Sequence, residues 1–144
     1  MNVTLVTSST VTSWAPGHDV WALWVDVRGW PAWDDSIRSV EFDGRFAPGA
    51  ELKVQENGGD PLLTRLMSVS QGEEFTTCTD LGSGIIRTAR HRLSASGPLA
   101  TVTHEIEVVV PESAMRDYLT GPWVRIQRDL PNRLWEMVDL ASPV

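Results

Sequence analysis

The chain has 144 residues and a net charge of −7, from 12 basic and 19 acidic residues. This length predicts a single domain, residues 1–144, that can bury a core without disulfides, and the one cysteine excludes a disulfide framework. The acidic balance argues against sequence-independent nucleic-acid binding. No apolar run is long enough for a membrane span, and the N-terminus does not resemble a signal peptide, so we expect a cytoplasmic protein.

The first part of the chain predicts a strand followed by two short helices. Val and Thr dominate Val3–Thr12, which is typical of a strand. After Pro16, apolar residues at helical spacing predict a helix that ends at Gly29; they are Val20, Leu23, Trp24 and Val27. Pro31 predicts the start of a second helix over Ala32–Arg38. We expect Asp34 and Asp35, on this second helix, to face solvent.

From Val40 to Val110 the hydrophobic period changes from that of a helix to that of a strand. Turn signals interrupt the alternation at Pro48-Gly49, Gly58-Gly59, Gln71-Gly72, Gly82-Ser83-Gly84 and Gly97-Pro98. Together they predict six antiparallel strands. The strand around Leu63 and Leu66 breaks the rule, because both of its faces are half apolar. Either its outer face meets a second subunit in a homodimer, or the register that the pattern assigns to it is wrong by one residue.

After Pro111 the helical period returns, at Trp123, Ile126, Leu130, Leu134, Met137 and Ala141. Pro131 lies inside this helix, so we expect a kink there. The whole order is one strand, two short helices, six strands and a long helix. It predicts an α+β fold, in which a curved seven-stranded antiparallel sheet wraps around the long C-terminal helix and buries both apolar faces.

Several local motifs resemble the helix-grip superfamily, which includes START domains, birch-pollen allergens and bacterial polyketide cyclase/dehydrase-like proteins. Val20–Val27 followed by Trp30–Trp33 is similar to the helix pair of the bacterial branch. Phe42–Gly44 with Pro48-Gly49 resembles its first hairpin, and Thr101–His104 its last strand. The resemblance implies a deep, mostly apolar cavity that holds a hydrophobic or aromatic small molecule. It also implies either a cofactor-independent cyclase or dehydratase, or a carrier or sensor without turnover.

Strand alternation selects the polar side chains that share the inner face of the sheet. His104 belongs to the apolar set of the last strand, and Arg87 and His91 to that of the strand before it. A two-residue turn at Gly97-Pro98 places His91 directly opposite His104. The same counting through the preceding turn puts three more residues on this face: Phe75, Thr77 and Thr79.

Two adjacent histidines in an apolar cavity lower each other's pKa, because burial and like charge both disfavour protonation. One neutral imidazole can then accept a proton while its neighbour donates one, which suits enolisation, aldol-type ring closure or loss of water. We therefore predict His91 and His104 as catalytic residues, with Arg87 holding a carboxylate or an enolate oxygen. No metal or cofactor is expected, because the inward sets hold too few ligands. The predicted ligand contacts are Trp24, Trp33, Phe75, Thr77, Thr79, Trp123, Ile126 and Leu130.

A purely structural role stays open for each of these residues. The two histidines can be hydrogen-bonded core residues, the tryptophans can be packing anchors, and Arg87 can reach water at the cavity mouth. An adaptor that uses only its exposed surface is a third, different class of function. Glu105, Glu107 and Cys78 are expected on the outer face, away from the histidines.

Overall fold

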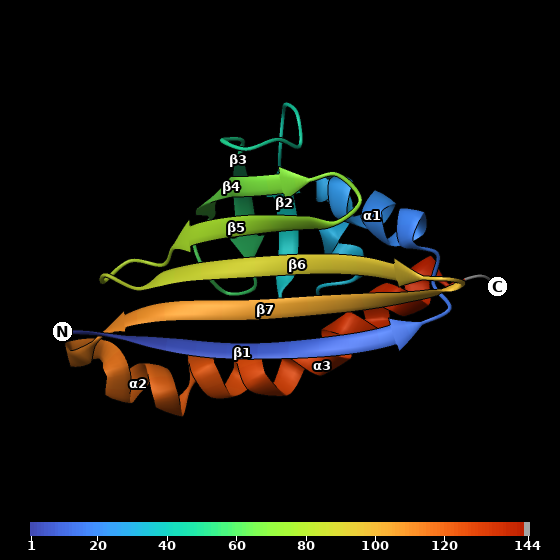
Figure 1. The fold of residues 1–144 in the computed structure, drawn as a ribbon. Coiled ribbons are helices and arrows are strands. Elements are labelled where there is room, and N and C mark those ends of the chain that lie inside the picture. The colour runs from blue at the N-terminus through green and yellow to red at the C-terminus, as the bar shows by residue number, and fades with distance from the viewer. Residues whose placement is uncertain (143–144) are drawn as a thin grey trace.

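Seven antiparallel strands form one sheet with the order β1-β7-β6-β5-β4-β3-β2 (Figure 1). The structure is a computed structural model that describes residues 1–142. The strands are β1 (Asn2–Ser13), β2 (Ile37–Glu41), β3 (Glu51–Glu56), β4 (Leu62–Ser70), β5 (Glu74–Asp80), β6 (Ile86–Ser96) and β7 (Leu99–Pro111). After β1 the chain crosses to the far edge at β2 and returns strand by strand, so the predicted meander of six strands is confirmed.

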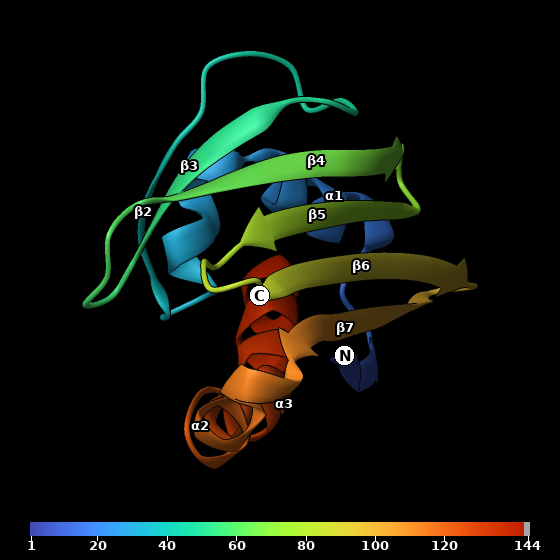
Figure 2. The same ribbon diagram turned by 90° about the vertical axis from the view of Figure 1, so that its left-hand side faces the viewer.

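The helices gather on one side of this sheet. They are α1 (Gly17–Val25), the 3₁₀-helices η1 (Val27–Ala32) and η2 (Glu112–Ala114), α2 (Met115–Thr120) and α3 (Pro122–Ala141). The sheet curves over α3, as the view turned by 90° shows (Figure 2). α3 contacts β1, β7 and α1, so the predicted curved sheet around a long C-terminal helix is confirmed. The helix continues through Pro131. No helix within residues 1–142 is both long and apolar enough to cross a membrane.

The predicted helix over Ala32–Arg38 is wrong. The second helical segment is η1, which contains Gly29 and ends at Ala32, and Ile37 already begins β2. The cause is a turn closed by Asp34, whose carboxylate accepts hydrogen bonds from the backbone N–H of Ser36 at 3.0 Å and from its hydroxyl at 2.6 Å. Such an aspartate turn competes with helical hydrogen bonding and directs the chain into the strand.

A β-bulge explains the mixed pattern of β4. Thr64 and Leu66 are buried, whereas Leu63 and Met67 are exposed. The pairing with β5 shifts between Leu66 and Ser68, so the alternation changes phase and Val69 packs against the core. The bulge shifts the register of the strand at Ser68, while Leu63 and Met67 stay exposed on its outer face. A homodimer through the exposed side chains stays a prediction.

Two apolar clusters fill the space between the sheet and the helices. The larger one centres on Trp24, which is fully buried and donates its indole N–H to the sulfur of Met137 at 2.8 Å. The smaller one contains Tyr118, Trp123 and Leu130, near the other end of β7. Replacing a buried tryptophan of this kind by alanine typically costs about 3–5 kcal/mol. The two clusters thus fix the relative positions of the strands and helices that bear the polar inner-face residues.

Candidate functional site

His91 of β6 lies directly opposite His104 of β7, the register that the two-residue turn at Gly97-Pro98 predicted. The two imidazole rings stack with centroids 4.0 Å apart. On its other face, His91 stacks on Phe75 at 4.3 Å and nearly parallel. The side chains are almost enclosed, since His91 is 6% and His104 4% exposed. The two histidines therefore sit in a column of rings on the concave face of the sheet.

The imidazole nitrogens of this column lack hydrogen-bond partners. Within the described part of the chain, neither nitrogen of His91 has one, nor does Nε2 of His104 or the indole nitrogen of Trp33. Most buried polar side-chain atoms in proteins are paired, and leaving one unpaired costs about 1–3 kcal/mol. No protein group within the described residues therefore pairs with these nitrogens, which leaves them available to a ligand or to water in the adjoining cavity.

Both imidazoles are neutral at pH 7. Burial, together with a smaller contribution from the positive charge of Arg133, lowers the pKa of His91 to about 3. Burial also holds the pKa of His104 well below 6.5, with smaller contributions from His91, Arg133 and Arg87. A neutral imidazole has one nitrogen that donates and one that accepts, so the pair offers both functions.

The column borders a small, partly enclosed cavity of about 80 Å³, which we call the chamber. Its lining is Trp30, Trp33, Asp34, Ser36, Ile37, Val54, Glu56, Thr64, Thr77, Thr79, Arg87, Ala89, His91, His104, Ile106 and Arg133. Binding sites for drug-sized ligands commonly have volumes of roughly 300–1,000 Å³, whereas a water molecule takes about 30 Å³. The chamber is thus smaller than the deep, mostly apolar cavity that the resemblance implies. In this conformation it has room for a few water molecules.

The structure brings six of the predicted site residues to the chamber and keeps five away from it. His91, His104, Arg87, Trp33, Thr77 and Thr79 line it. The other five, which the lining does not include, are Trp24, Phe75, Trp123, Ile126 and Leu130. Trp24 and Phe75 pack against the ring of His91 and so support it from behind. Trp123 and Leu130 belong to the second apolar cluster.

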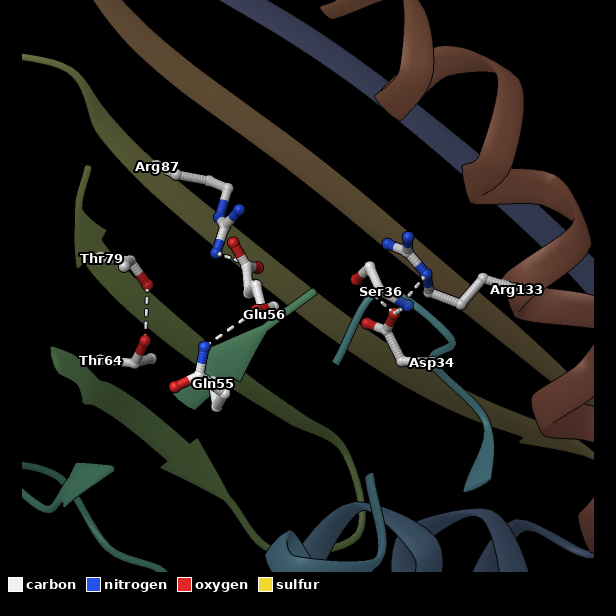
Figure 3. Close-up of polar contacts among 8 residues, drawn as sticks. All are labelled: Asp34, Ser36, Gln55, Glu56, Thr64, Thr79, Arg87 and Arg133. Carbon is white, nitrogen blue, oxygen red and sulfur yellow. Dashed lines mark hydrogen bonds and ion pairs between the residues drawn. The ribbon is translucent and has the colours of Figure 1, made fainter. Parts of the chain in front are cut away.

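Two ion pairs close the chamber (Figure 3). Arg87 of β6 contacts Glu56 at the end of β3, with 3.0 Å between Nη2 and Oε2. Arg133 of α3 contacts Asp34, with 2.9 Å between Nε and Oδ1. The prediction that Asp34 faces solvent is wrong, because this side chain is buried against Arg133 and Ser36. Asp35, its neighbour, is exposed as expected.

Sequence reasoning missed Asp34, Glu56 and Arg133 as part of this site, although the sequence held a signal for two of them. Glu56 continues the inward alternation of Leu52 and Val54 in β3. Arg133 follows Leu130 by one turn of α3 and therefore lies on the buried side of that helix. Both positions interrupt an apolar pattern with a charge, which is the feature that marks a functional residue on an inner face.

A wider hollow, which we call the outer groove, lies next to the chamber. Its volume is about 380 Å³, and it is lined by Asp35, Ser36, Glu56, Asn57, Pro122, Arg125, Ile126, Asp129 and Arg133. Ser36, Glu56 and Arg133 line both spaces. These three side chains are therefore the wall between the chamber and the groove.

No protein-family model matches this chain, and no curated protein sequence matches it either. Solved structures with the same fold are numerous. The di-domain ARO/CYC protein BexL from the BE-7585A biosynthetic pathway has a TM-score of 0.75 at 17% identity, over 98% of this chain and 51% of BexL. Truncated norcoclaurine synthase from Thalictrum flavum has a TM-score of 0.71 at 15% identity, over 96% of this chain and 94% of the synthase.

A START superfamily protein from Mycobacterium smegmatis has a TM-score of 0.63 at 17% identity, covering 92% of this chain and 98% of its own. The chain spans about half of BexL but nearly all of the other two proteins. It therefore has the helix-grip fold shared by the birch-pollen-allergen-like and START proteins. Because one fold hosts many activities, the function has to be argued from the chamber.

Proposed function

We propose that this protein binds an unsaturated or aromatic, polyketide-like small molecule in the chamber and catalyses a cyclisation or dehydration of it without a cofactor. His91 and His104 are the proton-transfer residues, and Arg87 orients an oxygen of the substrate. The observation that carries this proposal is the pair of stacked, neutral imidazoles with unpartnered nitrogens beside a partly enclosed cavity. These groups have hydrogen-bonding capacity that the protein itself does not use.

A dehydration illustrates how the pair would act. One imidazole takes a proton from the carbon next to a substrate carbonyl, while the other donates a hydrogen bond to the carbonyl oxygen. The first imidazole, now protonated, returns that proton to a β-hydroxyl group, which leaves as water while a carbon–carbon double bond forms. The positive charge of Arg87 stabilises the enolate between these two steps.

The low pKa values fit this cycle when the charge of the substrate is included. In the empty chamber an imidazole with a pKa near 3 is a weak base. An enolate forming beside it stabilises the imidazolium, so the pKa rises during the reaction. The resulting imidazolium is a strong acid once the negative charge is gone, which favours protonation of the leaving group. The same-fold enzymes norcoclaurine synthase and BexL support chemistry of this kind on this scaffold.

A non-catalytic carrier or sensor is the second candidate. It is favoured by the enclosure of the site, since both histidines are less than a tenth exposed and two ion pairs close the chamber. In such a protein the imidazoles only donate and accept hydrogen bonds to a ligand. Replacing them would then change only the affinity for the ligand, because such a protein catalyses no reaction.

Comparing the metabolites of the native host with those of a strain lacking this gene separates the two candidates. The enzyme predicts that a precursor accumulates which is isomeric with the lost product or differs from it by one water molecule. A carrier predicts that the finished product is still made and is merely redistributed. Unchanged chemistry in the deletion strain would contradict the enzymatic proposal.

A further inference from the structure

The wall between the chamber and the outer groove has to move before an aromatic ligand can enter. A cavity of about 150 Å³ is known to accept benzene, whereas the chamber has about 80 Å³. The outer groove adds about 380 Å³ on the other side of Ser36, Glu56 and Arg133. A ligand that reaches the histidines from the groove must therefore displace at least one of these side chains.

Arg133 is a wall residue whose Nε–H group has no well-aligned hydrogen bond. Its Nε lies 2.9 Å from Oδ1 of Asp34, yet this N–H makes no directed hydrogen bond within the described residues. The same Oδ1 already accepts two hydrogen bonds from Ser36. The Nε atom is shielded from bulk solvent, and the side chain of Arg133 as a whole is only 13% exposed. A guanidinium presents five N–H groups in a fork that fits a carboxylate with two parallel hydrogen bonds, and this one has spare capacity.

Asp34 is an equally imperfect partner. Its burial raises its pKa above the ordinary value, although the charge of Arg133 acts in the opposite direction. The effect of burial on the pKa of this carboxyl group is therefore larger than the opposite effect of the ion pair with Arg133. Its two hydrogen bonds from Ser36 do not depend on Arg133, because both groups belong to the same turn. Asp34 can thus keep these bonds when Arg133 turns to another acceptor.

We propose that the natural ligand carries a carboxylate, and that this carboxylate replaces Asp34 as the partner of Arg133 when the ligand passes from the outer groove into the chamber. The inference rests on the proposed function of the chamber and adds its ligand class. A neutral ligand offers nothing to compensate the buried guanidinium, so only an anionic one shifts Arg133 away from Asp34. The remainder of the ligand then faces Trp33, His91 and His104.

Two probes of equal shape test this assignment: 2-naphthoate, which has a carboxylate, and 2-naphthamide, which is neutral. Isothermal titration calorimetry measures both affinities on the purified full chain. We expect the wild-type protein to bind the acid about tenfold or more tightly than the amide, since charge-assisted hydrogen bonds are the stronger kind. Arg133→Gln removes this preference. Arg128→Gln keeps it, because Arg128 is 65% exposed on the same helix and pairs with Asp129.

Asp34→Asn provides the second arm, which does not depend on the folding of the Arg133 variant. Asparagine retains the acceptor oxygen for Ser36 but no longer competes for the guanidinium, so the affinity for 2-naphthoate rises about tenfold and that for 2-naphthamide stays unchanged. Equal affinities of the wild type for both probes overturn the carboxylate assignment and leave the binding function standing. An unchanged affinity for the acid in Asp34→Asn also overturns it. Failure of both probes to bind overturns the binding function itself.

Discussion

On β6 and β7, two neighbouring cross-strand pairs differ in how their side chains interact. Arg90 lies opposite Glu105 on the outer face, with complementary charges 2.9 Å apart and side chains 29% and 23% exposed. One residue further along, His91 lies opposite His104 on the inner face, with like groups stacked and nitrogens unpartnered. The backbone register is the same for both pairs. The outer pair stabilises the sheet with an ion pair. The inner pair instead has nitrogens without hydrogen-bond partners beside a cavity, and such a departure from good pairing is expected at functional sites.

Lowering the pH should give the largest effect, because it destabilises the folded protein through the inner histidine pair. The histidine pKa values are lowered in the folded state, so below pH 6.5 the unfolded chain binds protons that the folded chain does not, and stability falls as the pH falls. For His91, whose pKa is about 3, the loss between pH 6.5 and 4.5 is about 2 kcal/mol, and His104 adds a further loss in the same direction. Urea denaturation of the wild type and of the double variant His91→Gln/His104→Gln across this range measures it.

The double variant should show a slope with pH that is shallower by this amount. His18→Gln is the matched control, because the side chain of His18 is 85% exposed. An unchanged slope in the double variant would mean that the two imidazoles are not held neutral in the folded protein.

Removing the buried carboxylate of Asp34 comes second in size. Asp34→Ala leaves the charge of Arg133 enclosed and uncompensated, so we expect a loss of about 3 kcal/mol in the free energy of unfolding. Adding Arg133→Met to this variant should restore part of the loss, since it removes the orphaned charge. If the double variant is no more stable than Asp34→Ala alone, the destabilisation does not come from a buried unpaired charge.

Filling the chamber tests the inner face with less effect on stability. Thr77 is buried and lines the chamber, and Thr77→Phe adds a ring there at an expected loss of about 1–2 kcal/mol from overpacking. Binding of 2-naphthoate, followed by calorimetry, should be abolished. Thr76→Phe on the outer face of the same strand is the control and should bind as the wild type does. Undiminished binding by Thr77→Phe would place the ligand outside the chamber.

The outer pair should give the smallest effect. Arg90→Ala removes a partly exposed ion pair with Glu105, which is worth about 1 kcal/mol or less. Thermal or urea unfolding at pH 7 measures this loss directly. A cost as large as that of Asp34→Ala would show that the two faces of the sheet do not differ in the way described.

Local patterns were enough to predict the strands, the long helix and the register of the histidine pair. The turn at Gly97-Pro98 fixes that register, because a two-residue turn determines every pairing along the hairpin. The role of Asp34 was out of reach, since it depends on a partner in α3 that only tertiary packing brings close. The volume of the chamber was equally hidden, because it is set by how side chains from many elements pack together.

Complementation of the deletion strain shows whether the histidine pair performs the proposed chemistry. His91→Gln and His104→Gln should each leave the precursor unconverted, while Arg90→Gln, one position away on the outer face, should restore the product. Wild-type levels of product from either histidine variant, with the variant protein present at its normal amount, would contradict the account.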